Sequence, residues 1–439
     1  MRGKAVRLLF RGVPELVATG RLATAAAPLG ALEIEIVPAL SPRDRVIFLL
    51  HTAAEIEHSL MVQYLYAAWS LPPDGPPRAQ RWRRDILQVA REEMAHFAAV
   101  QNLLRFVGGP LNFDREDFPF RTDLYPFPLR LEPLSRRSLA RYVAAEMPAQ
   151  AAVDPRLLAD VAELAGSFGT GPVNRVGVLY ATLRELFADT GQLPDSAFRP
   201  GTASSTQAVP ARFRSDVGHG PLFLRTVRDR AGALSLLDDI AGQGEGDRDV
   251  PDSHFLTFVE MFDAWPGDAT PLDVPTQPNT STPPPEGADD PPTAAGRITH
   301  PRARAWAEVF NHHYRMLLSW LQQALLTDTR SAAGSGLGLR AFATMFVLSD
   351  VGQLLTTLPR TADGDGRAGA PFELPYTLAL PDLVADRWEQ QRDLIMTARG
   401  QLAGLGEGAS PAEDQVLRRL TASLAEAGEF VAVHAESPA

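Results

Sequence analysis

Two stretches of the sequence decide the fold: HTAAEIEHSLMVQYLYAAWSL at residues 51–71 and AREEMAHFAAVQNLLRFVGGP at residues 90–110. In both, apolar residues recur at the three- and four-residue spacing of a helix that buries one face. The first pattern ends at LPPDGPP (residues 71–77), and the second ends at Gly-Gly-Pro (residues 108–110). The sequence therefore predicts two long helices that end at these breakers.

Further segments with helical periodicity follow, and no convincing strand pair or internal repeat is present. We therefore predict an all-α fold. One expected helix, at residues 221–241, should end at the glycine-rich GQGEGD. We expect an N-terminal arm at residues 1–40 and a main helical bundle at residues 41–265. A Pro-rich linker or surface excursion should follow at residues 266–300, and a C-terminal helical region that packs on the bundle at residues 301–439.

The composition excludes several kinds of site and partner. The chain of 439 residues has no cysteine, so disulfides, thiolate-bound zinc, cysteine-held iron–sulfur clusters and a cysteine nucleophile are excluded. Its formal net charge of −11 disfavours nucleic acid or an anionic membrane as a partner. The sequence has no uninterrupted run of about 18 apolar residues, and its basic N-terminus does not resemble a signal peptide. We expect a cytoplasmic protein that acts on a small molecule.

Both decisive stretches place charged residues on faces that are otherwise apolar. Glu57 lies in the first stretch, and Glu93 and His96 lie three residues apart in the second, on one side of a helix. A carboxylate on such a face is costly unless a cation or hydrogen-bond donors compensate its charge. Alone, a Glu-x-x-His motif is most often a solvated Glu beside a His at the edge of the core. With Glu57 it forms half of the carboxylate–histidine site of ferritin-like bundles.

The same two stretches carry a family resemblance, together with six shorter ones. These are LYPFPLRLEPLS (124–135), YVAAEMP (142–148), VGVLYATL (176–183), IAGQGEGD (240–247), DSHFLTF (252–258) and AGAPFELP (368–375). Over about residues 40–400 the sequence resembles the ferritin-like domain family of the violacein-pathway iminophenylpyruvate dimer synthase. The resemblance implies a ferritin-like helical bundle with additional C-terminal helices and long loops, and metal ligands at Glu57, Glu93 and His96. It also implies a tailoring step in bacterial natural-product biosynthesis.

Four further residues are candidates for the other half of the metal site. Glu185 lies seven residues after Val178, a position where the resembled family often has a carboxylate. Glu146 ends an expected helix, and Glu245 lies between two glycines that allow a sharp turn. His254 begins an apolar helix and is the simplest second imidazole. Each also has an ordinary interpretation, as a solvated carboxylate or as a histidine at the edge of the core.

The residue types of these candidate ligands indicate the metal and the reaction. Carboxylates and imidazoles without thiolates favour iron, as one or two ions, with manganese as the alternative. We therefore predict a non-haem iron oxidoreductase or oxygenase that acts on a small organic molecule. A non-redox metal-dependent isomerase, cyclase or hydrolase and an inactive binding scaffold are the alternatives.

Other features of the sequence add little to this interpretation. Tyr64 and Tyr180 are expected to pack in the core or beside the metal ligands. No dinucleotide- or phosphate-binding motif is present. A homo-oligomer is compatible with the sequence.

Overall fold

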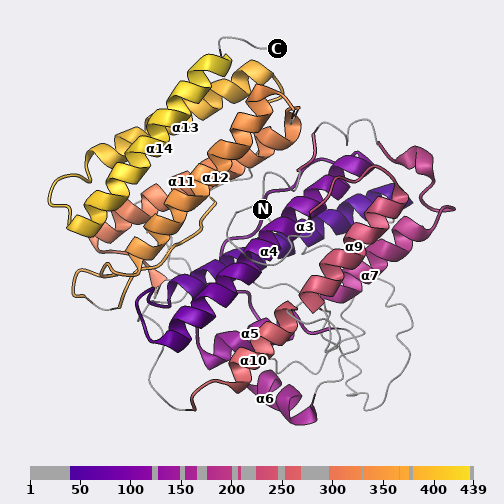
Figure 1. The fold of residues 1–439 in the computed structure, drawn as a ribbon, viewed down its shortest axis with the longest axis horizontal. Coiled ribbons are helices and arrows are strands. Elements are labelled where there is room, and N and C mark those ends of the chain that lie inside the picture. The colour runs from indigo at the N-terminus through magenta and orange to yellow at the C-terminus, as the bar shows by residue number, and fades with distance from the viewer. Residues whose placement is uncertain are drawn as a thin grey trace. The chain divides into compact units, whose positions relative to one another are not determined.

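A computed structural model gives the fold of most of the chain (Figure 1). It describes residues 40–120, 127–148, 154–165, 176–199, 206–208, 224–245, 253–267, 296–328, 330–364, 366–374 and 379–435. Nearly all of the arm expected at residues 1–40, and most of the linker expected at residues 266–300, lie outside these ranges. In the described ranges the elements are helices, with two isolated β-bridges and no strand. The all-α prediction is confirmed.

The chain forms two compact units, and the boundary between them falls within α3 (Pro42–Trp69) and α4 (Pro77–Val107). The first unit comprises Met1–Tyr64, Arg84–Leu129 and Leu134–Leu272. It contains most of α3 and α4, α5 (Arg136–Ala145), α6 (Pro155–Ala165), α7 (Val176–Ala188), the short 3-10 helix η1 (Asp195–Ala197), α9 (Arg230–Glu245) and α10 (His254–Asp263). The division of the chain expected from the sequence stays a prediction.

In the first unit, α3 and α4 are the two long helices predicted from the sequence, and they run antiparallel (Figure 1). The start of α3 meets the end of α4, where the Arg43 side chain donates from Nε to the Val107 carbonyl oxygen over 2.9 Å. Their apolar faces are buried, including Leu50 on α3 and Val100 on α4. This burial places Glu57 and Glu93, which lie on the same faces, inside the unit.

The structure corrects the limits expected for α9. The sequence suggested a helix at residues 221–241, whereas α9 spans Arg230–Glu245. Before it, the Gln207 amide makes two hydrogen bonds to the backbone of Val227, at 3.0 and 2.7 Å, which holds this segment in a non-helical conformation. Asp229 Oδ1 then accepts a hydrogen bond from the backbone N–H of Gly232 over 2.7 Å and caps the helix. At its other end α9 continues through the glycine-rich segment, so Gln243 lies on a helix and not in a turn.

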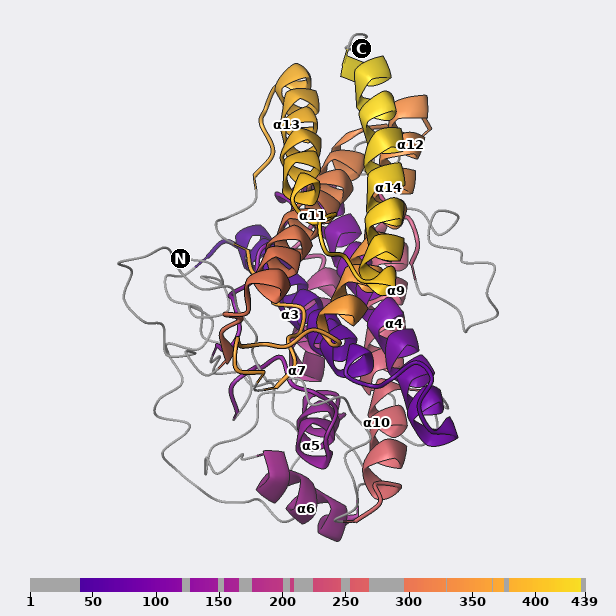
Figure 2. The ribbon, with the colours of Figure 1, turned by 90° about the vertical axis from the view of Figure 1, so that its left-hand side faces the viewer.

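The second unit comprises Leu65–Arg83, Arg130–Pro133 and Asp273–Ala439. Its helices are α11 (Pro301–Leu326), α12 (Ala332–Leu355), α13 (Val384–Ala403) and α14 (Pro411–Ala435), which lie side by side (Figure 2). α12 begins at Ala332, because the Ser331 hydroxyl accepts a hydrogen bond from the Gly334 N–H and caps it. Two ion pairs join α12 to α14, Arg340–Glu426 and Asp350–Arg419, each at 2.8 Å.

Two glycines let aromatic rings approach α12 closely. A side-chain carbon at Gly336 would collide with the Phe430 ring of α14, and one at Gly352 would lie 2.5 Å from the Trp69 indole. By length and composition alone, α12 is the one described helix that could cross a membrane, although the sequence has no uninterrupted apolar run of that length. This is weak evidence, because the core helix of a soluble bundle meets the same criteria.

Glu413 links the start of α11 to the turn before α14 through hydrogen bonds. Its Oε1 accepts hydrogen bonds from Arg302 Nε at 2.6 Å and from Trp306 Nε1 at 2.8 Å, and its Oε2 accepts one from the Ser410 N–H at 2.8 Å. Burial raises the pKa of this carboxyl, but the donors outweigh burial and lower it to about 2. The ionised form of Glu413 therefore stabilises the second unit.

Glu413→Gln should lower the free energy of unfolding by about 1–2 kcal/mol at pH 7, because it removes a carboxylate whose pKa of about 2 lies well below the ordinary value of 4.5. In the native protein this stabilisation is present above pH 4.5 and is lost as the pH falls toward 2. Chemical denaturation at several pH values measures both effects. Glu308→Gln, which removes an exposed partner of Arg304, is the control and should cost less than about 1 kcal/mol. Equal losses in the two variants would contradict the assignment.

Candidate metal centre

Five buried ionisable side chains from four helices meet inside the first unit. Glu57 comes from α3, Glu93 and His96 from α4, Glu146 from the residue that ends α5, and His254 from the start of α10. All five are at most 4% exposed. Candidate ligand atoms of Glu93, His96 and His254 lie within 4.8 Å of one another, close enough to hold a common metal ion.

Glu93 lies between the two imidazoles and divides the centre into two halves. Its Oε2 lies 3.3 Å from His96 Nδ1, and its Oε1 lies 2.8 Å from His254 Nδ1. Each imidazole also faces a second carboxylate through the same nitrogen. His96 Nδ1 lies 3.5 Å from Glu57 Oε2, and His254 Nδ1 lies 3.8 Å from Glu146 Oε2. Each half thus has one histidine and one glutamate of its own and shares Glu93.

The outer nitrogen of each imidazole has a partner that fixes the ring. His96 Nε2 lies 2.9 Å from Gln243 Oε1 on α9, and His254 Nε2 lies 2.9 Å from Glu92 Oε2 on α4. Because both partner atoms are acceptors, each Nε2 carries a proton and donates it. In a neutral ring this leaves the Nδ1 lone pair directed at the carboxylates, which is the arrangement of metal-binding histidines in proteins.

Two tyrosines hold the outer carboxylates in a matching way. The Tyr180 hydroxyl on α7 donates to Glu57 Oε1, and the Tyr64 hydroxyl on α3 donates to Glu146 Oε1. In both glutamates the other oxygen faces a histidine. Glu57 Oε2 is buried and has no hydrogen-bond partner. An orphaned, buried carboxylate oxygen directed at an imidazole nitrogen is what a metal ion would satisfy.

Without a metal, protons have to compensate the buried charge. Burial and the neighbouring Glu93 raise the pKa of Glu57 to about 8. Burial lowers the pKa of His96, but the neighbouring carboxylates of Glu57 and Glu93 outweigh it and raise the value to about 10. The pKa of His254 is likewise raised well above its ordinary value, where burial is outweighed by Glu93, Glu146 and Glu92. A divalent ion would replace these protons.

Comparison with protein-family models supports the fold. The ferritin-like family model matches residues 50–263, a range that holds the whole cluster. Residues 50–263 form a ferritin-like domain. A crystal structure of a ferritin-like protein from Caulobacter vibrioides matches with a TM-score of 0.44 and 21% identity, over 70% of this chain and 94% of that one.

Two curated relatives are similar in sequence. The chain is 29% identical over 391 residues to dichlorochromopyrrolate synthase of Lentzea aerocolonigenes, covering 76% of this chain and 36% of the relative. It is 28% identical over 312 residues to 2-imino-3-(indol-3-yl)propanoate dimerase of Chromobacterium violaceum, covering 62% and 28%. The match therefore spans about a third of the length of each relative. The resemblance noted in the sequence is confirmed at the level of the family.

The ferritin-like domain brings together five of the seven residues singled out in the sequence: Glu57, Glu93, His96, Glu146 and His254. Glu185 is not among them, because it is exposed on α7. It follows the inward-facing Tyr180 by five residues, which turns it about 140° away around the helix. Glu245 is the last residue of α9, and its side chain lies outside the described part of the chain.

Two residues of the cluster were missed in the sequence. Glu92 precedes Glu93 in the sequence, lies about 100° from it around α4, and contacts His254. Two adjacent glutamates on a largely apolar helix were the sequence feature that could have indicated its role. Gln243 carried no signal, because an uncharged amide in a glycine-rich segment resembles a turn residue. The domain also departs from the usual pattern of two Glu-x-x-His motifs: the second histidine, His254, takes its carboxylate from a different helix, through Glu146.

The metal-free protein should lose stability as the pH rises from about 7 to 10, above the range in which the buried His58 and His313, whose pKa values are lowered, affect stability. Glu57 and His96 both have pKa values in the folded state above their ordinary values of 4.5 and 6.5. The folded state therefore binds more protons than the unfolded state in this range, and stability falls by about 1.4 kcal/mol per pH unit for each extra proton. Chemical denaturation of the chelator-treated protein at several pH values measures this change in the free energy of unfolding, and the metal-loaded protein is the control. A stability that rises over this range would contradict the charge assignment.

Proposed function

We propose that this protein is a metal-dependent oxidative tailoring enzyme that uses non-haem iron on a small organic molecule in bacterial natural-product biosynthesis. The observation that carries the proposal is the pair of imidazoles around Glu93, each with Nε2 bound outward and Nδ1 directed at carboxylates. The five inward residues Glu57, Glu93, His96, Glu146 and His254 would hold the metal. Carboxylates with imidazoles suit iron, and manganese is the alternative.

The charge of the cluster favours two ions. Glu57, Glu93 and Glu146 face the centre, and Glu92 is bound to the back of His254. Four ionised carboxylates carry four negative charges, which two divalent ions balance when both histidines are neutral. A single divalent ion would leave two buried negative charges, which is costly in an interior of low dielectric constant. Glu93, which lies between the two imidazoles, would help to hold metal in either half of the centre.

The relatives support the substrate class. Their names describe the synthesis of dichlorochromopyrrolate and the dimerisation of 2-imino-3-(indol-3-yl)propanoate, both of them chemistry of small organic molecules. We infer that this chain also acts on a small molecule, derived from an amino acid or an indole. Because the match covers only about a third of each relative, its own reaction need not be theirs. The cytoplasm is the proposed location.

The residues of the centre would each have a defined task. Bound iron would supply electron transfer and the activation of oxygen. Tyr180 and Tyr64 fix the orientation of Glu57 and Glu146, and Gln243 and Glu92 fix the two rings. On one side of the centre Tyr64 packs against Tyr142 and Phe258, with ring centroids 4.9 Å away in each case, and this apolar wall keeps water from the carboxylates.

Metal stoichiometry tests the proposed ligands. Protein purified without chelator and analysed for elements should contain two ions per chain. Glu93→Ala should lose most of both, because both halves share it, whereas His254→Ala should keep about one. Glu185→Ala is the matched control, because this glutamate is exposed, and it should retain the native metal content. Native metal content in both Glu93→Ala and His254→Ala would show that the ions bind elsewhere.

Metal replacement tests the oxidative reaction. The iron-loaded protein should consume oxygen in the presence of an indol-3-yl 2-amino or 2-oxo acid offered as substrate. The zinc-loaded protein should not, because zinc has the same charge but no redox chemistry. Tyr180→Phe should retain the metal but turn over more slowly, because Glu57 loses the donor that orients it. Conversion of substrate by the zinc form without oxygen would overturn the oxidative assignment and favour a Lewis-acid enzyme.

A further inference from the structure

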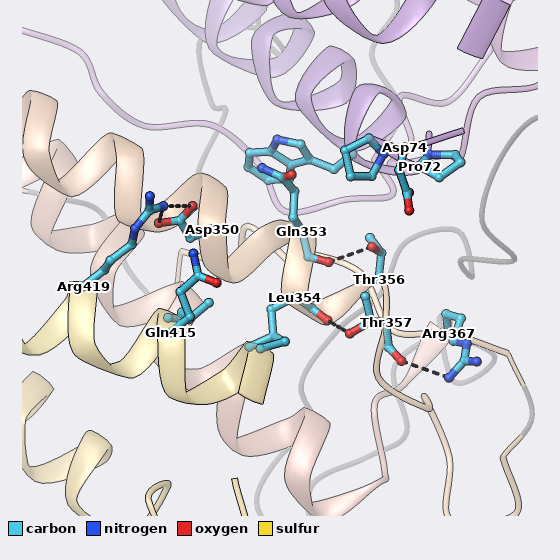
Figure 3. Close-up of a pocket in the computed structure, with 14 residues that line it drawn as sticks. Pro72, Asp74, Asp350, Gln353, Leu354, Thr356, Thr357, Arg367, Gln415 and Arg419 are labelled. Carbon is cyan, nitrogen blue, oxygen red and sulfur yellow. Dashed lines mark hydrogen bonds and ion pairs between the residues drawn. The ribbon is translucent and has the colours of Figure 1, made fainter. Parts of the chain in front are cut away.

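The second unit contains a cavity of about 720 Å³ that the metal centre does not use (Figure 3). Its lining comes from the end of α3 and the turn after it, from the last turns of α12 and from the first turns of α14. All of the lining residues belong to the second unit. The volume lies in the range of sites that bind small molecules, roughly 300–1,000 Å³.

One wall of the cavity is a tryptophan that packs against two other aromatic rings. The Trp69 indole stacks on Phe372 with an interplanar angle of 8° and meets Phe310 edge-on. On another side it presses on the backbone of Gly352, where a larger residue would not fit. Phe372 holds its ring there although its backbone φ of 50° is unfavourable for a residue with a side chain. Leu354 and Val416 add apolar surface to the same cavity.

Two opposite charges lie at one end of the cavity without neutralising each other. Asp74, in the turn after α3, directs its carboxylate into the space, and Arg367 lies across from it (Figure 3). Arg367 donates to the carbonyl oxygen of Thr357 over 2.9 Å, and it makes no ion pair with an acid in the described chain. Asp74 makes no ion pair with a described basic residue either. One unpaired anion and one unpaired cation therefore face a shared space.

The other end of the cavity has no net charge. Arg419 binds both carboxylate oxygens of Asp350, at 2.9 and 2.8 Å, so this pair is internally neutralised. Gln415 lies beside it and offers an uncharged amide (Figure 3). A ligand that fits must therefore carry both charges at one end and be neutral at the other. A phosphate compound fits poorly, because it brings two or more negative charges to a single unpaired arginine.

We propose that this cavity binds an aromatic α-amino acid. The ammonium group would pair with Asp74 and the carboxylate with Arg367, which can accept it as a planar, two-pronged donor. The aromatic side chain would lie beside Trp69, Leu354 and Val416, where burial of its apolar surface stabilises the complex. The two charges at one end of the cavity favour a zwitterion. The uncharged lining of the rest, which includes Trp69, favours an aromatic side chain on the ligand. This site is independent of the proposed metal centre.

Calorimetric titration with four probes tests the proposal on the full chain, with and without metal. L-Tryptophan should bind saturably. Tryptamine, which lacks the carboxylate, indole-3-propionate, which lacks the ammonium group, and L-alanine, which lacks the ring, should each bind at least about ten-fold more weakly, the size expected for losing a charged hydrogen bond or a large apolar contact. The result should not depend on metal loading, so a failure here is distinct from a failure of the metal assignment.

Two variants identify the groups that recognise each charge. Arg367→Gln should weaken L-tryptophan and indole-3-propionate by about ten-fold or more and leave tryptamine unchanged. Asp74→Asn should weaken L-tryptophan and tryptamine and leave indole-3-propionate unchanged. Both side chains are exposed, so the variants should keep the native helical signal. Arg330→Gln, at an exposed arginine paired with Asp328 away from the cavity, is the control and should bind as the native protein does.

Three results would overturn the proposal. The first is the absence of saturable binding of L-tryptophan and L-phenylalanine at millimolar concentration. The second is binding that Arg367→Gln and Asp74→Asn leave unchanged, which would place the ligand elsewhere. The third is equal affinity for L-tryptophan and indole-3-propionate, which would show a site for plain aromatic carboxylates.

Discussion

The charge of Glu93 is the constraint on which the first unit depends. A carboxylate that is 2% exposed inside a helical bundle is tolerated only if other groups compensate it on both sides. His96 lies on its own helix, one turn away, but His254 has to come from α10. The positions of α4 and α10 are therefore tied to one side chain, and a shift of either would leave a buried charge without its partner.

A second set of side chains surrounds the cluster and holds its members in place by hydrogen bonds. Gln243 and Glu92 bind the outer nitrogens of the rings, and Tyr64 and Tyr180 bind the outer oxygens of the glutamates. These contacts leave the inner atoms directed at a common point. Such preorganisation means that a bound ion would find its ligands already oriented and would pay little entropy to assemble them.

How much of the centre could be predicted from the sequence depended on the kind of signal that each residue leaves. Glu57, Glu93 and His96 could be predicted because charges on an apolar helical face are costly and their spacing places them together. His254 could be predicted because it begins an apolar helix. Glu92 could not be assigned, since its partner belongs to α10, and helix spacing carries no information about which distant helix faces a residue.

The errors at α7 and α9 have a similar origin in tertiary contacts. On α7 the inward position is taken by Tyr180, so Glu185 is exposed. α9 starts later than the sequence pattern predicts, because hydrogen bonds from the Gln207 side chain hold the preceding backbone out of a helix. It ends later than predicted, because the helix continues through two glycines that are typical of a turn. Local propensity predicts neither, since a distant amide competes successfully with the helical pattern.

The glycines of α12 have a consequence for how such helices are interpreted. Gly336 and Gly352 admit the rings of Phe430 and Trp69, so the axis of α12 can come nearer to its neighbours than larger side chains would allow. Small residues at close helix crossings are also the signature of helices that associate within lipid, where hydrocarbon surrounds them instead of water. A tight helix–helix contact thus selects the same residues in either solvent. The two glycines of α12 therefore report how closely its neighbours approach, and they say little about the medium that surrounds the helix.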